Sequence, residues 1–241
     1  MIIRQELCVG CGRCQPLCPT AAIRYEGTKS IVHQDICYEC GTCLRSAICP
    51  VSAIAESSNA YEYPRALRKY FSDPNATHVA TGIQGRGTEE SKSNDVTHRV
   101  GSDEIGVAIE IGRPTIGMSI LEIQKITRAI ARAGIHKIEP HNPIHSMIAN
   151  EATGDLKPEM LGERVLSAII EIKVKRDELR GILRTLKEVA QEVDSVFCND
   201  ACTIVEPGLK IPEEVLESIR AEGLTWRPNA KINMGMGRAW E

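Results

Sequence analysis

Two stretches of the sequence decide the N-terminal fold: Cys8-Val-Gly-Cys11-Gly-Arg-Cys14-Gln-Pro-Leu-Cys18-Pro19-Thr-Ala-Ala-Ile23 and Cys37-Tyr-Glu-Cys40-Gly-Thr-Cys43-Leu-Arg-Ser-Ala-Ile-Cys49-Pro50-Val-Ser-Ala-Ile54. They match down to the proline after the last cysteine and the Ala-Ile pair beyond it. Such an internal repeat indicates that each half is one supersecondary unit. Two residues between successive cysteines let a tight loop turn three thiolates towards one metal centre, and the small residues Gly10, Gly12 and Gly41 permit the turns.

The first stretch resembles the C-x2-C-x2-C-x3-C-P run of bacterial ferredoxins that carry two clusters. The resemblance covers roughly the first quarter of the chain and implies two [4Fe–4S] clusters. In that family the fourth cysteine of each run binds the cluster of the other run. The resemblance therefore implies one cluster held by Cys8, Cys11, Cys14 and Cys49, and a second held by Cys37, Cys40, Cys43 and Cys18. Both clusters then lie in one small core, close enough for electrons to pass between them.

The second stretch departs from the family pattern, because five residues rather than three separate Cys43 from Cys49. We expect the longer loop to change the solvent exposure of the first cluster, and so its potential, without removing a ligand. Pro50 and the pair Ala53-Ile54 restore the register of the repeat. The alternative of zinc bound by two CxxC pairs is disfavoured by the third cysteine of each run.

The rest of the composition is that of an ordinary globular chain. It has 241 residues, a formal net charge of −3 and ten cysteines, eight of them between Cys8 and Cys49. The short start before Cys8 leaves no room for a signal peptide, so we expect a cytoplasmic protein with metal-binding thiols rather than disulfides. We also expect an anaerobic host, although no residue encodes it. No basic face suggests a nucleic acid, and no apolar run is long enough for membrane insertion.

Composition and patterning predict an α+β protein of four parts. These are a two-cluster ferredoxin module (1–60), a helix over Arg65–Phe71 with a polar, Gly-rich linker loop over Thr81–Asp103 (together 61–105), a second domain (106–206), and a short helix opened by Pro212 with an irregular tail (207–241).

The second domain alternates strand and helix patterns. Strands are predicted near 107–111, 135–139, 170–174 and 196–205, the last interrupted by Asn199-Asp200. Helices are predicted from the capping box Ser119-Ile-Leu-Glu122 to Gly134, and over Asp177–Val193. The order βαββαβ predicts a ferredoxin-like α/β sandwich, in which a four-stranded antiparallel sheet carries two helices on one face. Here the term ferredoxin-like refers only to the fold, because this domain has no motif for binding a cluster.

Two pairs of potential ligands lie outside the repeat. Cys198 and Cys202 are either a redox-active pair, two ligands of a site completed by another chain, or, as we favour, two small buried residues. Residues four apart on a strand are roughly 13 Å from each other, too far for a disulfide. His141 and His145 have helical spacing, but Pro140 and Pro143 favour a loop without a metal.

The Gly-rich stretch from Gly82 to Thr97 resembles a segment of anaerobic iron–sulfur proteins, some described as hydroxynicotinate reductase-like. Its glycines at 82, 85 and 87 are compatible with a phosphate-binding loop, with a loop that grips a partner subunit, or with a disordered linker. Of the two functional interpretations we favour the partner-gripping loop, because no strand clearly precedes the glycines.

These features support an electron-transfer subunit that passes single low-potential electrons to or from a larger flavin- or metal-containing oxidoreductase. The alternative is a ferredoxin-dependent reductase with a substrate pocket in the C-terminal domain. It is less favoured because the sequence has no fingerprint of a two-electron cofactor. A third hypothesis, an effector-sensing C-terminal domain, rests on fold analogy alone.

Two cubanes predict about eight iron and eight sulfide per chain after anaerobic purification. Because eight cysteines already supply eight ligands, a Cys198→Ser/Cys202→Ser double variant should hold as much iron as the parent protein. Iron and sulfide analysis measures both quantities. Loss of a quarter or more of the iron from the double variant would show that these two cysteines help to hold a cluster.

Overall fold

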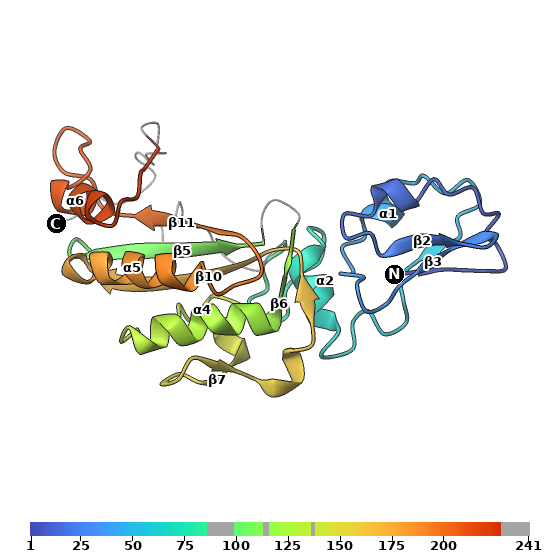
Figure 1. Cartoon of the computed structure of the whole chain (residues 1–241), viewed down its shortest axis with the longest axis horizontal. Coiled ribbons are helices and arrows are strands. Elements are labelled where there is room, and N and C mark those ends of the chain that lie inside the picture. The colour runs from blue at the N-terminus through green and yellow to red at the C-terminus, as the bar shows by residue number, and fades with distance from the viewer. Residues whose placement is uncertain (86–98, 113–115, 136–137, 228–241) are drawn as a thin grey trace.

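The computed structural model describes residues 1–85, 99–112, 116–135 and 138–227. The chain is elongated, with the N-terminal module at one end and a sheet with its helices at the other (Figure 1). Helix α2 (Ala66–Ser72) lies between these two parts. The predicted α+β class is confirmed, and the helix expected over Arg65–Phe71 is present one residue further along the chain.

In the N-terminal module, each half of the cysteine repeat contributes a strand, a cysteine loop and a second strand. Strands β2 and β3 form a hairpin between the halves, and β1 pairs with β4 so that the ends of the module meet. The elements are β1 (Ile2–Ile3), the 3-10 turn η1 (Gln15–Leu17), β2 (Ile23–Glu26), β3 (Lys29–Val32), α1 (Thr42–Arg45) and β4 (Ile54–Ala55).

The backbone of the module repeats as the sequence does. Gly12 and Gly41, which follow equivalent cysteines, have φ angles of 70° and 69°. Ala21 and Ser52, each three residues after the last cysteine of a run, have φ angles of 53° and 49°. Non-glycine residues rarely adopt this left-handed conformation. This conformation recurs at matching positions. Both loops therefore turn sharply in the same way around their cysteines.

The C-terminal domain is built on an antiparallel sheet of order β10-β5-β11. Its strands are β5 (Glu104–Ile111), β10 (Ala168–Lys175) and β11 (Phe197–Cys202). Helices α4 (Ile120–Arg132) and α5 (Leu179–Val189) pack beside each other against this sheet. Alternate strand residues face the helices and are buried with them: Ile105, Val107, Ile109, Ile111, Ile170, Ile172 and Val174.

Strands β5, β10 and β11 lie where the first, third and fourth strands of the predicted βαββαβ arrangement were expected. The second strand was expected over 135–139, of which residues 136 and 137 lie outside the described part of the chain. The amide of Glu139 donates to the carbonyl of Glu171 in β10 at 2.8 Å, so this segment lies at the outer edge of β10. A four-stranded sheet remains a prediction. The prediction that Asn199-Asp200 interrupts the last strand is wrong, because both residues pair with β5.

The predicted helix ends are largely confirmed. The Ser119 hydroxyl accepts a hydrogen bond from the amide of Glu122 at 3.2 Å, as a helix N-cap does. Helix α6 (Glu213–Ala221) follows Pro212 directly. Helix α5 is shorter than predicted, because a 3-10 turn, η5 (Arg176–Glu178), precedes it and turns follow it.

Short elements just before α4, and between α4 and β10, complete the domain. β6 (Met118–Ser119) pairs with β9 (Arg164–Val165), and β7 (Ile148–Asn150) forms a hairpin with β8 (Asp155–Leu156). The 3-10 turns are η3 (His145–Met147) and η4 (Pro158–Met160).

The two parts of the chain have separate apolar cores. One core draws only on residues of the cysteine module, from Met1 to Ile54, and the other extends from Leu67 to Val215. Leu67 and Phe71 of α2 belong to the second core. The helix predicted within the linking segment 61–105 is therefore packed as part of the C-terminal domain.

Residues 86–98 of the predicted Thr81–Asp103 loop and residues 228–241 of the tail lie outside the described residues. Within the part of the chain that the structure describes, no helix combines the length and the apolar character needed to cross a membrane.

We predict that residues 61–241 fold without iron, because their core contains no residue of the cysteine module. A fragment of residues 100–241 lacks Leu67 and Phe71, and removing buried side chains of this size costs about 2–5 kcal/mol each. Unfolding followed by circular dichroism should show one cooperative transition for the longer fragment and a weaker one for the shorter. A molten longer fragment would mean that its core depends on the cysteine module.

Candidate iron–sulfur site

The first group of cysteines surrounds one small cavity in the N-terminal module. Cys8, Cys11, Cys14 and Cys49 all line it, together with the apolar side chains of Ile3, Val9, Val51 and Ile54. The structure thus brings Cys49, from the end of the second run, beside three cysteines of the first run. Cys14 is buried, whereas Cys11 is exposed, so this cavity lies close to the protein surface.

The second group is more deeply placed. Cys37, Cys40 and Cys43 are all buried. Burial, followed by the nearby thiols of Cys40, Cys37 and Cys18, raises the pKa of Cys43 to about 12. Cys18, from the first run, is therefore close to Cys43 of the second run. The last cysteine of each run thus lies beside cysteines of the other run.

Hydrogen bonds to sulfur repeat between the two halves. The amide of Ala22 donates to Cys18 Sγ, and the amide of Ala53 donates to Cys49 Sγ, each at 3.2 Å. In both cases the donor lies four residues after the cysteine, beyond the Cys-Pro turn. Amide donors stabilise the negative charge on a thiolate, and they are among the features that set the potential of an iron–sulfur cluster.

The two additional residues between Cys43 and Cys49 form part of an extra turn of chain. Where the first run has the 3-10 turn η1, the second has the α-helical turn α1, followed by Ala47 in a left-handed conformation with φ 50°. Cys49 still lines the cavity of the first group, so the longer loop does not displace it. Nη1 of Arg45 in α1 lies 2.5 Å from Oδ1 of Asp73, which joins this turn to the chain after α2.

Burial and amide hydrogen bonds shift the pKa values of these thiols in opposite directions. Burial raises the pKa of Cys14 and of Cys37, so both thiols hold their protons more tightly than a thiol in water. At Cys49 the balance is reversed: burial opposes ionisation, but amide hydrogen bonds from Ala53 and its neighbours lower the pKa. A bound cation stabilises thiolates and releases their protons. Eight thiols in two sets of four, with amides directed at sulfur, are a donor set that fits iron–sulfur clusters.

Helix α2 covers the second group through a buried arginine. Arg68 donates to the carbonyls of Gln34 and Cys37, each at 2.8 Å, and forms an ion pair with Glu163 of the C-terminal domain. Its side chain is only 7% exposed. Arg68 thereby connects the loop that begins the second cysteine run to the C-terminal domain.

Tyr38, next to Cys37, reinforces this contact. A Cβ atom at Gly117, whose φ is 73°, would lie 2.3 Å from Cε2 of the Tyr38 ring, so only glycine allows this approach. Sequence reasoning missed both Arg68 and Tyr38. The spacing of Arg65, Arg68 and Lys69, which places three cations on one face of a helix, was the available signal.

The other candidate ligands are not part of this site. Cys198 is exposed and Cys202 is partly exposed, so the interpretation of two buried residues is wrong for both. Both lie in one continuous strand, β11, which keeps them too far apart for a disulfide. His141 lies in a turn and His145 begins the 3-10 turn η3, which confirms a loop rather than a helical pair.

Family models match the N-terminal region of the chain. A 4Fe-4S binding domain matches residues 1–24, and an LdpA Fe-S cluster-binding domain matches residues 14–60. No solved structure shows a significant match.

Three curated relatives align with parts of the chain. A ferredoxin of Pyrobaculum islandicum is 32% identical over 72 residues, which are 30% of this chain and 65% of the relative. Ferredoxin-1 of Rhodobacter capsulatus is 45% identical over 40 residues, 17% of this chain and 62% of the relative. One subunit of the ion-translocating oxidoreductase complex of Methanosarcina acetivorans is 43% identical over 47 residues, 20% of this chain and 17% of the relative.

The chain therefore spans less than two thirds of each of these relatives. The two family models together cover residues 1–60, which hold both cysteine groups. Together with the thiol geometry, these matches show that the N-terminal region of this chain is a 4Fe-4S iron–sulfur domain of the ferredoxin type, a domain whose chemistry is electron transfer.

Proposed function

We propose that the chain is an electron-transfer protein or subunit that carries two [4Fe–4S] clusters and passes single electrons to or from a larger oxidoreductase. One observation carries the proposal: Cys49 lines one cavity with Cys8, Cys11 and Cys14, and Cys18 lies beside Cys43 of the second run, all within one small module. We assign Cys8, Cys11, Cys14 and Cys49 to the first cluster, and Cys37, Cys40, Cys43 and Cys18 to the second. Clusters of this kind take up one electron each, so the domain stores two and delivers them singly.

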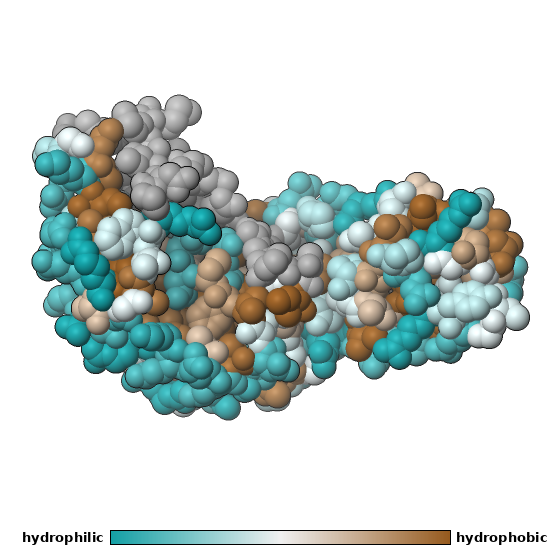
Figure 2. Space-filling view, turned by 45° about the horizontal axis from the view of Figure 1, so that its top comes forward, coloured by the Kyte–Doolittle hydropathy of each residue, from teal (hydrophilic) through white to brown (hydrophobic). Residues whose placement is uncertain are grey.

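The first cluster is proposed as the point of exchange with the partner. Next to the exposed Cys11, Val9 is 63% exposed and Leu7 is 40% exposed, and Val9 also lines the cavity of the first group. Figure 2 shows apolar side chains reaching the surface of the N-terminal module. The second group, by contrast, is buried beneath α2, Arg68 and Tyr38. A partner can therefore bring its cofactor closer to the first group.

The nature of the partner follows from the same chemistry. A carrier of single electrons needs a protein whose cofactor accepts or supplies them, and flavins and metal centres do so. The Methanosarcina relative is by name part of an oxidoreductase complex, which supports a setting of this kind for the present chain. Small apolar patches beside a redox centre suit transient electron-transfer contacts, which are among the smallest protein interfaces.

Cys18→Ser tests the assignment of the clusters. The variant should lose or alter the cluster held by Cys37, Cys40 and Cys43, because Cys18 lies with those thiols. The matched variant Cys49→Ser should instead alter the cluster held by Cys8, Cys11 and Cys14. Electron paramagnetic resonance of the reduced proteins, with iron analysis, distinguishes the two outcomes. Damage by Cys18→Ser to the cluster of its sequence neighbours would contradict the assignment.

A Leu7→Ser/Val9→Ser variant tests the exchange surface. It should reduce a flavin-containing acceptor protein, flavodoxin, about tenfold more slowly, because about 1.4 kcal/mol of apolar contact is worth a factor of ten. Stopped-flow absorbance measures the rate, and ferricyanide, which needs no protein surface, should react at the parent rate. Val79→Ser is the matched control, since Val79 is 74% exposed and lies outside the cysteine module. Equal rates for the double variant and the parent would exclude this surface.

A further inference from the structure

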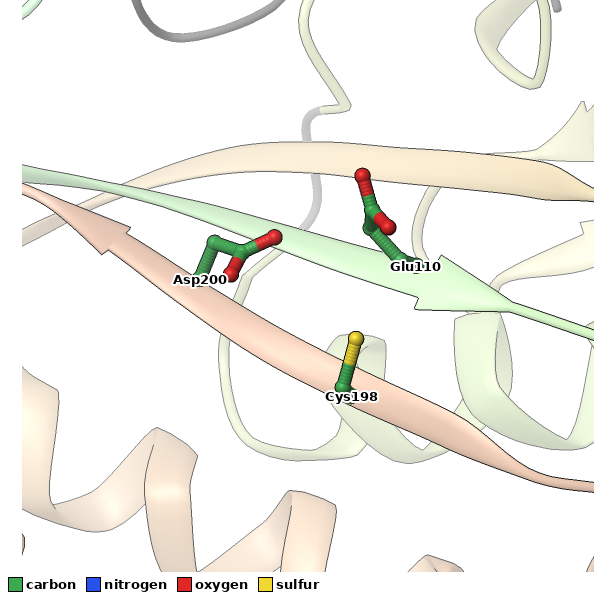
Figure 3. Close-up of side chains that lie close together, drawn as sticks. All are labelled: Glu110, Cys198 and Asp200. Carbon is green, nitrogen blue, oxygen red and sulfur yellow. The ribbon is translucent and has the colours of Figure 1, made fainter. Parts of the chain in front are cut away.

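A second set of metal-ligand side chains lies outside the cysteine repeat, on the face of the sheet that points away from α4 and α5 (Figure 3). Glu110 comes from β5, and Cys198 and Asp200 come from β11. Cys198 is paired directly with Glu110 in the ladder, and Asp200 follows two residues later on the same face. The thiol sulfur and one oxygen of each carboxylate all lie within 4.8 Å of one another.

We propose that Glu110, Cys198 and Asp200 bind one divalent ion of the zinc class. Magnesium and calcium take oxygen ligands, so a sulfur ligand beside two carboxylates favours zinc over them. Zinc is usually four-coordinate, and three protein ligands leave its fourth position to water or another small ligand. As the zinc–sulfur bond forms, Cys198 gives up its thiol proton to solvent.

The ladder fixes this arrangement without help from a flexible loop. Side chains directly opposite each other in an antiparallel pair have Cβ atoms about 4.5–5.5 Å apart, which places Cys198 and Glu110 within reach of one ion. Asp200 is opposite Ala108, two residues before Glu110 on β5, so both carboxylates lie on the same face of the sheet. Carboxylates at close quarters on neighbouring strands repel each other, and a shared cation offsets that repulsion.

The site is accessible and has a natural control residue. Cys198 and Asp200 are exposed and Glu110 is partly exposed, so an ion can enter from solvent. Cys202 faces the same side of β11 as Cys198, but it is opposite Gly106, at the other end of the strand. About 13 Å separates positions four apart on a strand, so Cys202 cannot share the ion with Cys198.

The test uses the full chain with its iron–sulfur clusters assembled, mixed anaerobically with one equivalent of zinc and freed of excess ion. We expect about one zinc per chain. X-ray absorption at the zinc edge should show one sulfur ligand at about 2.3 Å, with oxygen or nitrogen in the remaining positions. Cys198→Ser should remove that sulfur signal, and Cys202→Ser should leave it unchanged. Loss of outer-sphere partners alone weakens metal binding about 10–100-fold, so Asp200→Asn, which changes a direct ligand, should weaken it at least tenfold.

Three results would overturn the proposal. The loaded chain could retain no zinc. The absorption spectrum could show four sulfur ligands, which would place the ion among the cysteines of the repeat. Finally, Cys202→Ser could remove the sulfur signal as completely as Cys198→Ser does. Because exposed Cys→Ser changes on an edge strand perturb folding little, circular dichroism of both variants should match the parent.

Discussion

The structure depends on one constraint, the gathering of eight cysteines in and around a very small N-terminal core. A module of about sixty residues buries little apolar surface, and chains of this size commonly need a metal or disulfides to fold stably. Three of the ten buried residues of this core are cysteines and three more cysteines pack against it. Burial raises the pKa of Cys14, Cys37 and Cys43. A bound cation can replace the thiol protons and stabilise the resulting thiolates within this core. Ligation of iron and folding of the module are thus parts of one equilibrium.

The same constraint explains the backbone. Left-handed residues recur at matching positions of the two runs, and the amides of Ala22 and Ala53 point towards sulfur atoms in the same way. The repeat therefore gives the two thiol groups nearly the same local chemistry. Their surroundings differ because Arg68 of α2 and Gly117 of the C-terminal domain contact the loop around Cys37, whereas Cys11 of the first group is exposed. Since solvent exposure and hydrogen bonding both set cluster potentials, an internally symmetric module acquires two unequal sites.

Arg68 accounts for much of the difference between the surroundings of the two cysteine groups. A buried guanidinium with carbonyl partners on one side and a carboxylate on the other is costly to disrupt, because its partners are desolvated as well. It holds the second cysteine loop to the C-terminal domain, while the first loop remains open to solvent. The sheet of that domain shows a similar division. One face builds the apolar core with α4 and α5, and the other carries charged and thiol side chains in a fixed register.

The sequence by itself determined the features that depend on local spacing. The cysteine repeat predicted the two runs and their turns, and the capping box at Ser119, Pro212 and the alternating apolar residues of β5 and β10 predicted helix starts and strands. These signals are local because each depends on residues a few positions apart. The sequence also implied, through family resemblance, that Cys18 and Cys49 exchange between the groups.

Only the tertiary structure decided which thiol group is covered. Arg68 lies about thirty residues from the carbonyls it binds, and Glu163 is 95 residues further along the chain. Tyr38 meets Gly117 through a contact that no short-range pattern encodes. Strand β11 runs through Asn199 and Asp200 against local preference, because pairing with β5 satisfies its backbone. Contacts of this range appear only when the whole chain is packed, since burial and long-range pairing outweigh the weak preferences of single residues.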